Sequence, residues 1–200
     1  MPNWCNNTLT LEHKDPAMIA RARAAFVKGE FLHEFIPVPL CLTETVAGSF
    51  ADPEKQAALE KSMQDNLNAY NYANWYDFCV NEWGTKWDVG GGDGYINDIE
   101  GGLILTFDSA WSPPITAYER LTEMGFKVHA MYYEPGMCFA GIWEDGIDSF
   151  YEYGDMSAAE VAECFPTELD EAFGISESMA EYEEENQEID LDGGLSATNE

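Results

Sequence analysis

The sequence predicts an α+β sandwich, in which a mostly antiparallel sheet carries helices on one face, with a helical insertion and an acidic C-terminal extension. Three observations favour this class. Segments with the two-residue alternation of strands and segments with helical spacing follow one another through most of the chain. A Pro-Gly pair joins two late strand-like segments, as in an antiparallel hairpin. The charge pattern then changes abruptly, since no Lys or Arg follows Lys127.

The first segments are typical of a strand and then a helix. Residues 3–11 alternate well enough for a strand, with Cys5, Leu9 and Leu11 among the side chains on one face. An Asp-Pro pair at 15 and 16 then gives a helix N-cap followed by a proline in the first turn, and a glycine at 29 ends the helix. The apolar residues 31–40 contain two prolines, which exclude a central strand. We expect them to form an extended connection packed on the core.

A second helix is predicted over residues 52–83, as an insertion into the sandwich. Asp52 precedes a proline, which repeats the cap of the first helix. An apolar stripe at helical spacing follows and continues as far as Trp83, where Gly84 ends it.

The remaining body reads as strand, helix and hairpin. The β-branched and aromatic residues 103–111 predict a strand, and two prolines open a helix over residues 112–125. Residues 126–133 and 137–143 alternate on either side of the Pro-Gly turn, which predicts a hairpin. A final short strand can follow at residues 149–153.

Five short blocks, in order, resemble the YubB ferredoxin-like family of small bacteriophage and conjugative-plasmid proteins. They are "MPNWCNNTLTL", "FLHEFIPVP", "WGTKWD", "LTFDSAWSPP" and "YYEPGMCFAGIW". The resemblance covers most of residues 1–145 and implies a ferredoxin-like sandwich, with no catalytic or binding residues to carry over. We therefore expect a ferredoxin-like domain over residues 1–150. Residues 151–200, the acidic helical or partly disordered extension, lie outside the resemblance.

Net charge restricts the class of partner. The chain has 38 Asp and Glu against 9 Lys and Arg, a formal charge of -29. Such a surface repels nucleic acid and anionic membranes and favours basic partners, including proteins whose own ligand is nucleic acid. Residues 144–200 hold 19 of the 38 acidic residues and none of the 9 basic ones.

The cysteines and the hydropathy pattern exclude several other classes. Five cysteines are spread along the chain without a Cys-x-x-Cys pair, so neither a zinc site nor a disulfide framework is expected. The sequence shows no secretion signal and no apolar run of the roughly 20 residues that a membrane-spanning helix needs. We therefore expect a cytoplasmic protein of the host cell, with no cofactor and no metal.

No residue pattern indicates a reaction. His13, His33 and His129 stand apart from any Cys, Ser or carboxylate at a catalytic or metal-binding spacing. The glycine-rich segment 90–94 matches no phosphate-binding loop. Because carboxylates are so numerous, acid and base pairs arise by chance. We expect a non-enzymatic protein.

The acidic extension suggests an accessory protein of a mobile element that binds a host protein, as an anti-defence inhibitor or DNA mimic. Ser157, Thr167 and Ser176 are candidate N-caps of short helices, with carboxylates close behind them. A helical path over residues 160–188 is about 42 Å long and carries eleven carboxylates, so its charge is more dilute than that of duplex DNA. Mimicry of DNA would therefore require the acidic surface of the whole folded protein, including the body. The expected partner-binding residues are Glu160, Glu163, Asp170, Glu171, Glu177, Glu181, Glu183, Glu184, Glu185 and Glu188.

The motif "NEWGTKWD", residues 81–88, supports an alternative function. A tryptophan-lined pocket for a small ligand or peptide would use Trp83, Lys86, Trp87, Asp88 and Trp111. A structural clamp at a helix-to-strand corner is the other interpretation, since aromatic clusters commonly lie in cores. We expect Lys86 to pair with Asp88 or Asp108, or its stem to pack on an indole.

Overall fold

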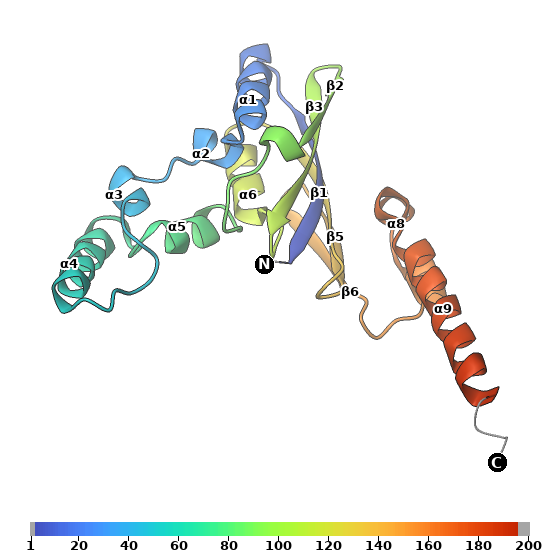
Figure 1. Ribbon diagram of the computed structural model, residues 1–200. Helices are drawn as coiled ribbons and strands as arrows, with labels where there is room; N and C mark the ends of the chain where they lie inside the picture. Colours follow the sequence, from blue (N-terminus) through green and yellow to red (C-terminus); the bar gives the residue numbers. More distant parts are fainter. Residues whose placement is uncertain (1–2, 196–200) are drawn as a thin grey trace.

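The computed structural model describes residues 3–195, apart from the side chains of Asp93 and residues 187–195 (Figure 1). Its strands are β1 (Trp4–Glu12), β2 (Tyr95–Ile99), β3 (Gly102–Ala110), β4 (Lys127–Glu134), β5 (Phe139–Glu144) and β6 (Ile147–Glu152). Its helices are α1 (Pro16–Lys28), α2 (Phe31–Phe35), α3 (Leu40–Thr43), α4 (Pro53–Tyr70), α5 (Trp75–Glu82), α6 (Ile115–Glu123), α7 (Ala158–Cys164), α8 (Thr167–Phe173) and α9 (Ile175–Leu195), with a 3-10 turn η1 (Gly91–Asp93).

The predicted α+β class is confirmed. The six strands form one sheet in the order β2-β3-β1-β4-β5-β6, and each neighbouring pair is antiparallel. Along the chain, β1, α1, β2, β3, α6 and β4 make a β-α-β-β-α-β unit, into which α2 to α5 are inserted before β2. The hairpin β5–β6 then extends the sheet beyond β4.

The sequence forms β1 because its alternate side chains enter a core. Leu9 and Leu11 are fully buried, as is the polar side chain of Asn7. The Asn7 amide donates to the Cys5 carbonyl at 2.7 Å and its oxygen accepts from the Tyr118 hydroxyl at 3.2 Å. These bonds satisfy a polar group that would otherwise be costly to bury.

The connection after α1 differs from the prediction. The α1 ends agree with it, since the Asp15 carboxylate accepts from the Ala17 N–H at 2.9 Å. Residues 31–40, however, are not wholly extended, because they contain α2 and the start of α3. The Asp88 carboxylate accepts from the Leu32 and His33 N–H groups at 2.6 and 2.9 Å, which caps the first turn of α2 from a distant part of the chain.

The single helix predicted over residues 52–83 is two helices. Asp52 caps α4 as expected, accepting from the N–H groups of the first turn. Asn71 then adopts the left-handed conformation with φ 64 and ends α4. Asn74 starts α5, its side-chain oxygen accepting from the Tyr76 and Asp77 N–H groups.

One strand was not predicted, and another that the pattern left open is present. β2 lies at the sheet edge and is mostly exposed, so it lacks the apolar alternation that identifies a half-buried strand. β6 forms the opposite edge, and its residues Ile147–Glu152 overlap the final short strand expected at residues 149–153.

Helices lie on both faces of the sheet, so the prediction of helices on one face is wrong. α1, α2, α5 and α6 pack with β1, β3 and β4 around the larger core. On the opposite face, Val161, Leu169 and Ile175 of the C-terminal helices are fully buried against Ala140 and Ile142 of β5. The C-terminal helices appear in red on the right of Figure 1. They can dock there because the outer strands carry apolar side chains on this face as well.

Burial of the cysteines leads to a prediction about thiol reactivity. Cys5 and Cys79 are buried, and desolvation raises the pKa of each thiol to about 12, whereas Cys164 is exposed. Because the thiolate is the reactive form, an aromatic disulfide reagent at about pH 8 should modify Cys164 first. Cys41 and Cys138, which are partly exposed, should follow, and Cys5 and Cys79 should react only on unfolding. A Cys164→Ser variant should lack the fast phase; rapid modification of Cys5 in the folded protein would contradict the assignment.

Candidate functional site

The three C-terminal helices form what we call the acidic layer, α7 to α9. No Lys or Arg follows Lys127, so the layer has no basic side chain. Besides Glu160, six of the expected partner-binding carboxylates are solvent-exposed: Glu163, Glu171, Glu177, Glu181, Glu184 and Glu185. Those of α9 recur at spacings of three and four residues, which places them along one side of the helix. The side chain of Glu188 lies outside the described residues.

The other three expected carboxylates hold the layer together. Glu160 completes a capping box with Ser157, whose hydrogen bonds lower the pKa of this carboxyl group. Asp170 accepts from the Ser176 N–H at 2.7 Å and from its hydroxyl at 2.5 Å. Glu183 of α9 accepts from the Ala158 N–H at 2.8 Å, which ties α9 to the start of α7.

Two of the predicted N-caps are wrong. Ser157 caps α7 as expected, but the cap position of α8 is Pro166, and Thr167 is the first residue within the helix. Ser176 lies inside α9, where its hydroxyl donates to Asp170. α8 therefore begins without a side-chain cap, and it leads into α9 through the left-handed Gly174. The Asp170 carboxylate bonds to the Ser176 N–H in the first turn of α9.

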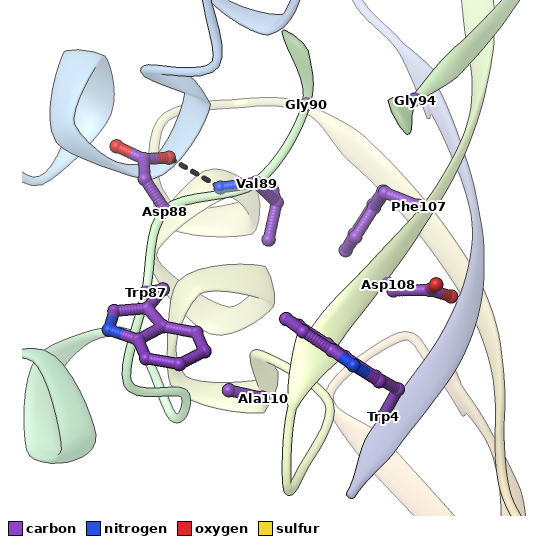
Figure 2. Close-up of a pocket in the computed structure, with 9 residues that line it drawn as sticks. All are labelled: Trp4, Trp87, Asp88, Val89, Gly90, Gly94, Phe107, Asp108 and Ala110. Atoms are coloured by element: carbon purple, nitrogen blue, oxygen red, sulfur yellow. Dashed lines mark hydrogen bonds between the residues drawn. The ribbon is translucent and has the colours of Figure 1, made fainter. Parts of the chain in front are cut away.

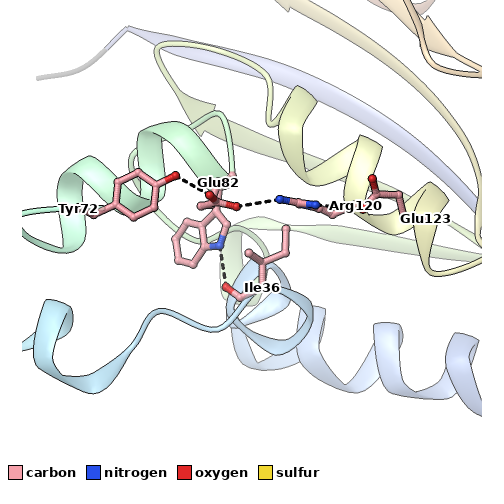
Figure 3. A network of polar contacts seen from close by, with 6 residues as sticks. Ile36, Tyr72, Glu82, Arg120 and Glu123 are labelled. Atoms are coloured by element: carbon pink, nitrogen blue, oxygen red, sulfur yellow. Dashed lines mark hydrogen bonds and ion pairs between the residues drawn. The ribbon is translucent and has the colours of Figure 1, made fainter. Parts of the chain in front are cut away.

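Within the "NEWGTKWD" motif, Trp83 is a core residue. Its ring is only 4% exposed, and its indole N–H donates to the Ile36 carbonyl at 2.9 Å (Figure 3). The neighbouring Glu82 accepts from the Tyr72 hydroxyl at 2.5 Å and pairs with Arg120 of α6 at 3.3 Å. The hydrogen bond to Glu82, together with desolvation, raises the pKa of Tyr72 to about 12. This part of the motif therefore fixes α5 against its neighbours.

Lys86 lies against aromatic rings, the second of the two arrangements expected for it, and is not paired with Asp88 or Asp108. Its ammonium lies 4.8 Å from the centroid of the Trp87 ring, 4.9 Å from that of Trp111 and 5.7 Å from that of Tyr76. The ion pairs found among the described residues do not include Lys86. We call these three rings the lysine cage. Trp111 contributes to it with a left-handed backbone, φ 69, which is uncommon for a bulky residue.

The two carboxylates expected to pair with Lys86 have other partners. Asp88 is committed to backbone, accepting from Leu32, His33 and its neighbour Val89. Desolvation nevertheless raises the pKa of Asp88, because burial outweighs these hydrogen bonds. Asp108 accepts from the Asn6 amide at 2.6 Å and is solvent-exposed.

Beside the cage, two half-exposed tryptophans flank a pocket of about 340 Å³ (Figure 2). Trp4 is 46% exposed and Trp87 is 39% exposed, and their ring centroids are 5.8 Å apart. Gly90 forms part of the opposite wall, where a Cβ would lie 2.3 Å from the Phe26 carbonyl oxygen. We call this cavity the tryptophan pocket; its lining is Trp4, Trp87, Asp88, Val89, Gly90, Gly94, Phe107, Asp108 and Ala110.

The residues proposed from sequence for a ligand pocket are thus divided among different roles. Trp83 is core, Asp88 caps α2, and Lys86 with Trp111 belongs to the lysine cage. Trp87 and Asp88 line the tryptophan pocket, and a neighbouring pocket of about 360 Å³ is lined by four of the five proposed residues, Trp83, Lys86, Trp87 and Asp88. Trp4 was missed, because its contact with Trp87 joins residues far apart in sequence.

A second, largely apolar pocket of about 610 Å³ lies where α9 meets the β4–β5 hairpin. The rings of Tyr133 and Tyr153 stack there at 6.1 Å, with Met179 and Tyr182 of α9 opposite. Among the described residues, no group of three or more His, Cys, Asp or Glu side chains could hold a metal ion. In the same part of the chain, no helix combines the length and apolar character needed to cross a membrane.

Comparisons with known proteins give a distant structural neighbour. No family model matches the sequence, and no curated protein does. Among solved structures, the chain is similar to the crystal structure of a protein api92 from Yersinia pseudotuberculosis, family-model DUF1281. The identity is 12% and the TM-score 0.42, over 77% of this chain and 99% of that chain. A similarity this distant carries neither fold nor function to the protein.

Proposed function

We propose that the protein is a non-enzymatic accessory protein of a mobile genetic element, which binds a basic host protein through its acidic layer. One observation carries this proposal. Six exposed carboxylates stand on helices that are docked on the sheet, in a layer without a basic side chain. A docked layer presents its charges in a fixed arrangement, which favours a specific complementary surface and fast association.

The class of partner follows from the charge and its spacing. The five carboxylates from Glu177 to Glu185 span about 12 Å of helix, or roughly one charge per 3 Å, against about 1.7 Å in duplex DNA. The charge density of the α9 carboxylates is therefore too low for this helix alone to mimic a DNA duplex. A host protein with a basic nucleic-acid groove, such as a defence nuclease, is the partner we propose, and any mimicry of DNA would involve the body as well.

We further infer that the β-α-β-β-α-β unit is ferredoxin-like, as the resemblance to the YubB family implies. Two features support this inference. The unit's strands lie in the order β4-β1-β3-β2, all antiparallel, and α1 and α6 pack on the same face. The acidic layer would then be an addition to a common scaffold, and scaffolds of this kind host unrelated functions.

Charge neutralisation tests the function. A variant with Glu177, Glu181, Glu184 and Glu185 changed to Gln should lose capture of its host partner at about 0.05 M salt, with affinity falling roughly tenfold or more. Wild-type capture should also weaken steeply at about 0.5 M salt. Captured proteins are identified by mass spectrometry from host lysate.

A matched control removes the same charge from the body. Its four substitutions, at exposed carboxylates distant in sequence from the layer, are Glu44→Gln, Glu54→Gln, Asp65→Asn and Glu119→Gln. This variant should retain the partner. If both variants lost capture to the same extent, the net charge of the protein and not the acidic layer would determine binding. If no partner were captured at low salt, the proposal would be overturned.

A further inference from the structure

β3 extends beyond the end of β2, its neighbour on the side away from β1. β2 pairs with β3 only as far as Tyr95 opposite Thr106, whereas β3 continues to Ala110. Beyond that point the chain of residues 87–94 turns through η1 instead of continuing the ladder. The last residues of β3 thus have a strand neighbour on the β1 side alone among the described residues.

Alternate residues of β3 direct their backbone N–H and C=O groups toward β1 or away from it. The Trp111 N–H donates to the Asn3 carbonyl at 2.9 Å, so Trp111 and every second residue before it bond toward β1. In an antiparallel ladder the intervening residues point the other way. Asp108 and Ala110 therefore direct their N–H and C=O groups away from β1. The Ala110 carbonyl accepts from the Thr85 hydroxyl at 3.0 Å, and no partner for the other three groups is found in the described part of the chain.

The tryptophan pocket lies directly beside these groups. Phe107, Asp108 and Ala110 of β3 form one side of it, and Trp87 and Val89 form the other (Figure 2). A chain entering the pocket in extended form would meet the outward-facing backbone of β3 at strand spacing. We call Asp108 to Ala110 the open half of β3; Asp108 is exposed there, whereas Ala110 lies in the pocket wall and is 1% exposed.

The charges around the tryptophan pocket determine which kind of peptide segment can bind there. One Asp108 carboxylate oxygen accepts from Asn6, and the side chain remains exposed at the pocket. The indole faces of Trp4 and Trp87 attract cations, and guanidinium groups stack on them well. Lys86 lines the neighbouring pocket and its ammonium is held in the lysine cage, so no basic side chain lines the tryptophan pocket itself.

We propose that the open half of β3 binds a short extended segment of a partner protein as an added strand, with an arginine of that segment on Trp4 or Trp87 and paired with Asp108. The segment exchanges backbone hydrogen bonds with Asp108, and one of its carbonyl groups accepts from the Ala110 N–H. This inference deepens the proposed function and rests on it for the basic character of the partner, but it uses a site separate from the acidic layer.

The test titrates capped pentapeptides into the full chain and follows tryptophan fluorescence and amide exchange at Asp108 and Ala110. The probe is acetyl-Thr-Val-Arg-Val-Thr-amide, compared with a Glu-centred peptide and with the Arg peptide N-methylated in its backbone. The Arg peptide should bind about tenfold more tightly than either and slow exchange of the Ala110 amide. Trp4→Ala and Asp108→Asn should each weaken it about fivefold or more, whereas Tyr182→Ala, at an exposed ring of α9, should not.

Several outcomes would overturn the inference. If the N-methylated peptide bound as tightly as the Arg peptide, the segment could not be an added strand. If ethylguanidinium bound as tightly as the Arg peptide, the pocket would be a site for a small cation only. Protection of the same amides that disappears on dilution without peptide would assign the edge to a second copy of the chain. The variant with four Gln residues in α9 should still bind the peptide. If the wild-type protein binds the peptide but captures no basic partner from lysate at low salt, the peptide site stands and the proposed function falls. If the peptide does not bind while the wild-type protein still captures a basic partner, the proposed function stands and the peptide site is wrong.

Discussion

Replacing Trp83 by alanine is expected to lower the free energy of unfolding by about 3–5 kcal/mol. The ring is 4% exposed within the larger core, and its N–H is bonded to the Ile36 carbonyl, so the substitution leaves both a cavity and an unpaired acceptor. Trp87→Ala should cost only about 1 kcal/mol, because this ring is 39% exposed and loses mainly contacts with Trp4 and Lys86. Urea unfolding followed by circular dichroism measures both.

Trp83→Phe separates the two causes. It keeps an aromatic ring in the core but removes the N–H, so its loss of stability should lie between those of the two alanine variants. If Trp83→Ala and Trp87→Ala destabilised the protein equally, the division of the motif into a core anchor and a surface ring would be wrong.

Replacing Leu169 by alanine should detach the acidic layer without changing its charge. Leu169 of α8 is fully buried against the outer strands, and Leu→Ala at such positions costs about 2–5 kcal/mol. Backbone amides of α7 to α9 should exchange with solvent much faster than in the wild type, and capture of the host partner should fall with them. Hydrogen exchange and the lysate capture assay report the two effects.

Leu67→Ala is the matched control, because that leucine of α4 is 43% exposed and its loss should leave both readouts near the wild-type values. Capture that persists in Leu169→Ala, while the layer exchanges freely, would mean that the carboxylates act as an unstructured charged segment. The docked arrangement would then be irrelevant to binding.

The sequence predicted those parts of the fold that depend on local contacts. The caps at Asp15, Asp52 and Ser157 are correct because each carboxylate or hydroxyl bonds to N–H groups two or three residues ahead. α2 was missed because its cap is Asp88, more than fifty residues away. The break after α4 depends on the left-handed Asn71, a conformation that asparagine tolerates but its neighbours do not signal.

The candidate sites divide in the same way. Exposure of the α9 carboxylates could be expected, since ionised groups are rarely buried without a partner. The structural roles of Asp170 and Glu183 could not, because Asp170 bonds across the turn between α8 and α9, and Glu183 bonds to a residue that the packing of the layer brings near. Trp4 and Trp87 meet across 83 positions of sequence, and nothing in either local pattern indicates that contact. Partner binding at either site remains a prediction.

The lysine cage has a consequence for the thermodynamics of recognition. A surface tryptophan ordinarily loses rotational freedom when a ligand covers it, at a cost of about 0.5–1.5 kcal/mol for an immobilised side chain. Trp87 already carries the Lys86 ammonium over its ring and contacts Trp4, so much of that entropy is lost when the protein folds. The recognition surface is thereby preorganised, and a weakly binding segment needs fewer contacts to remain in place.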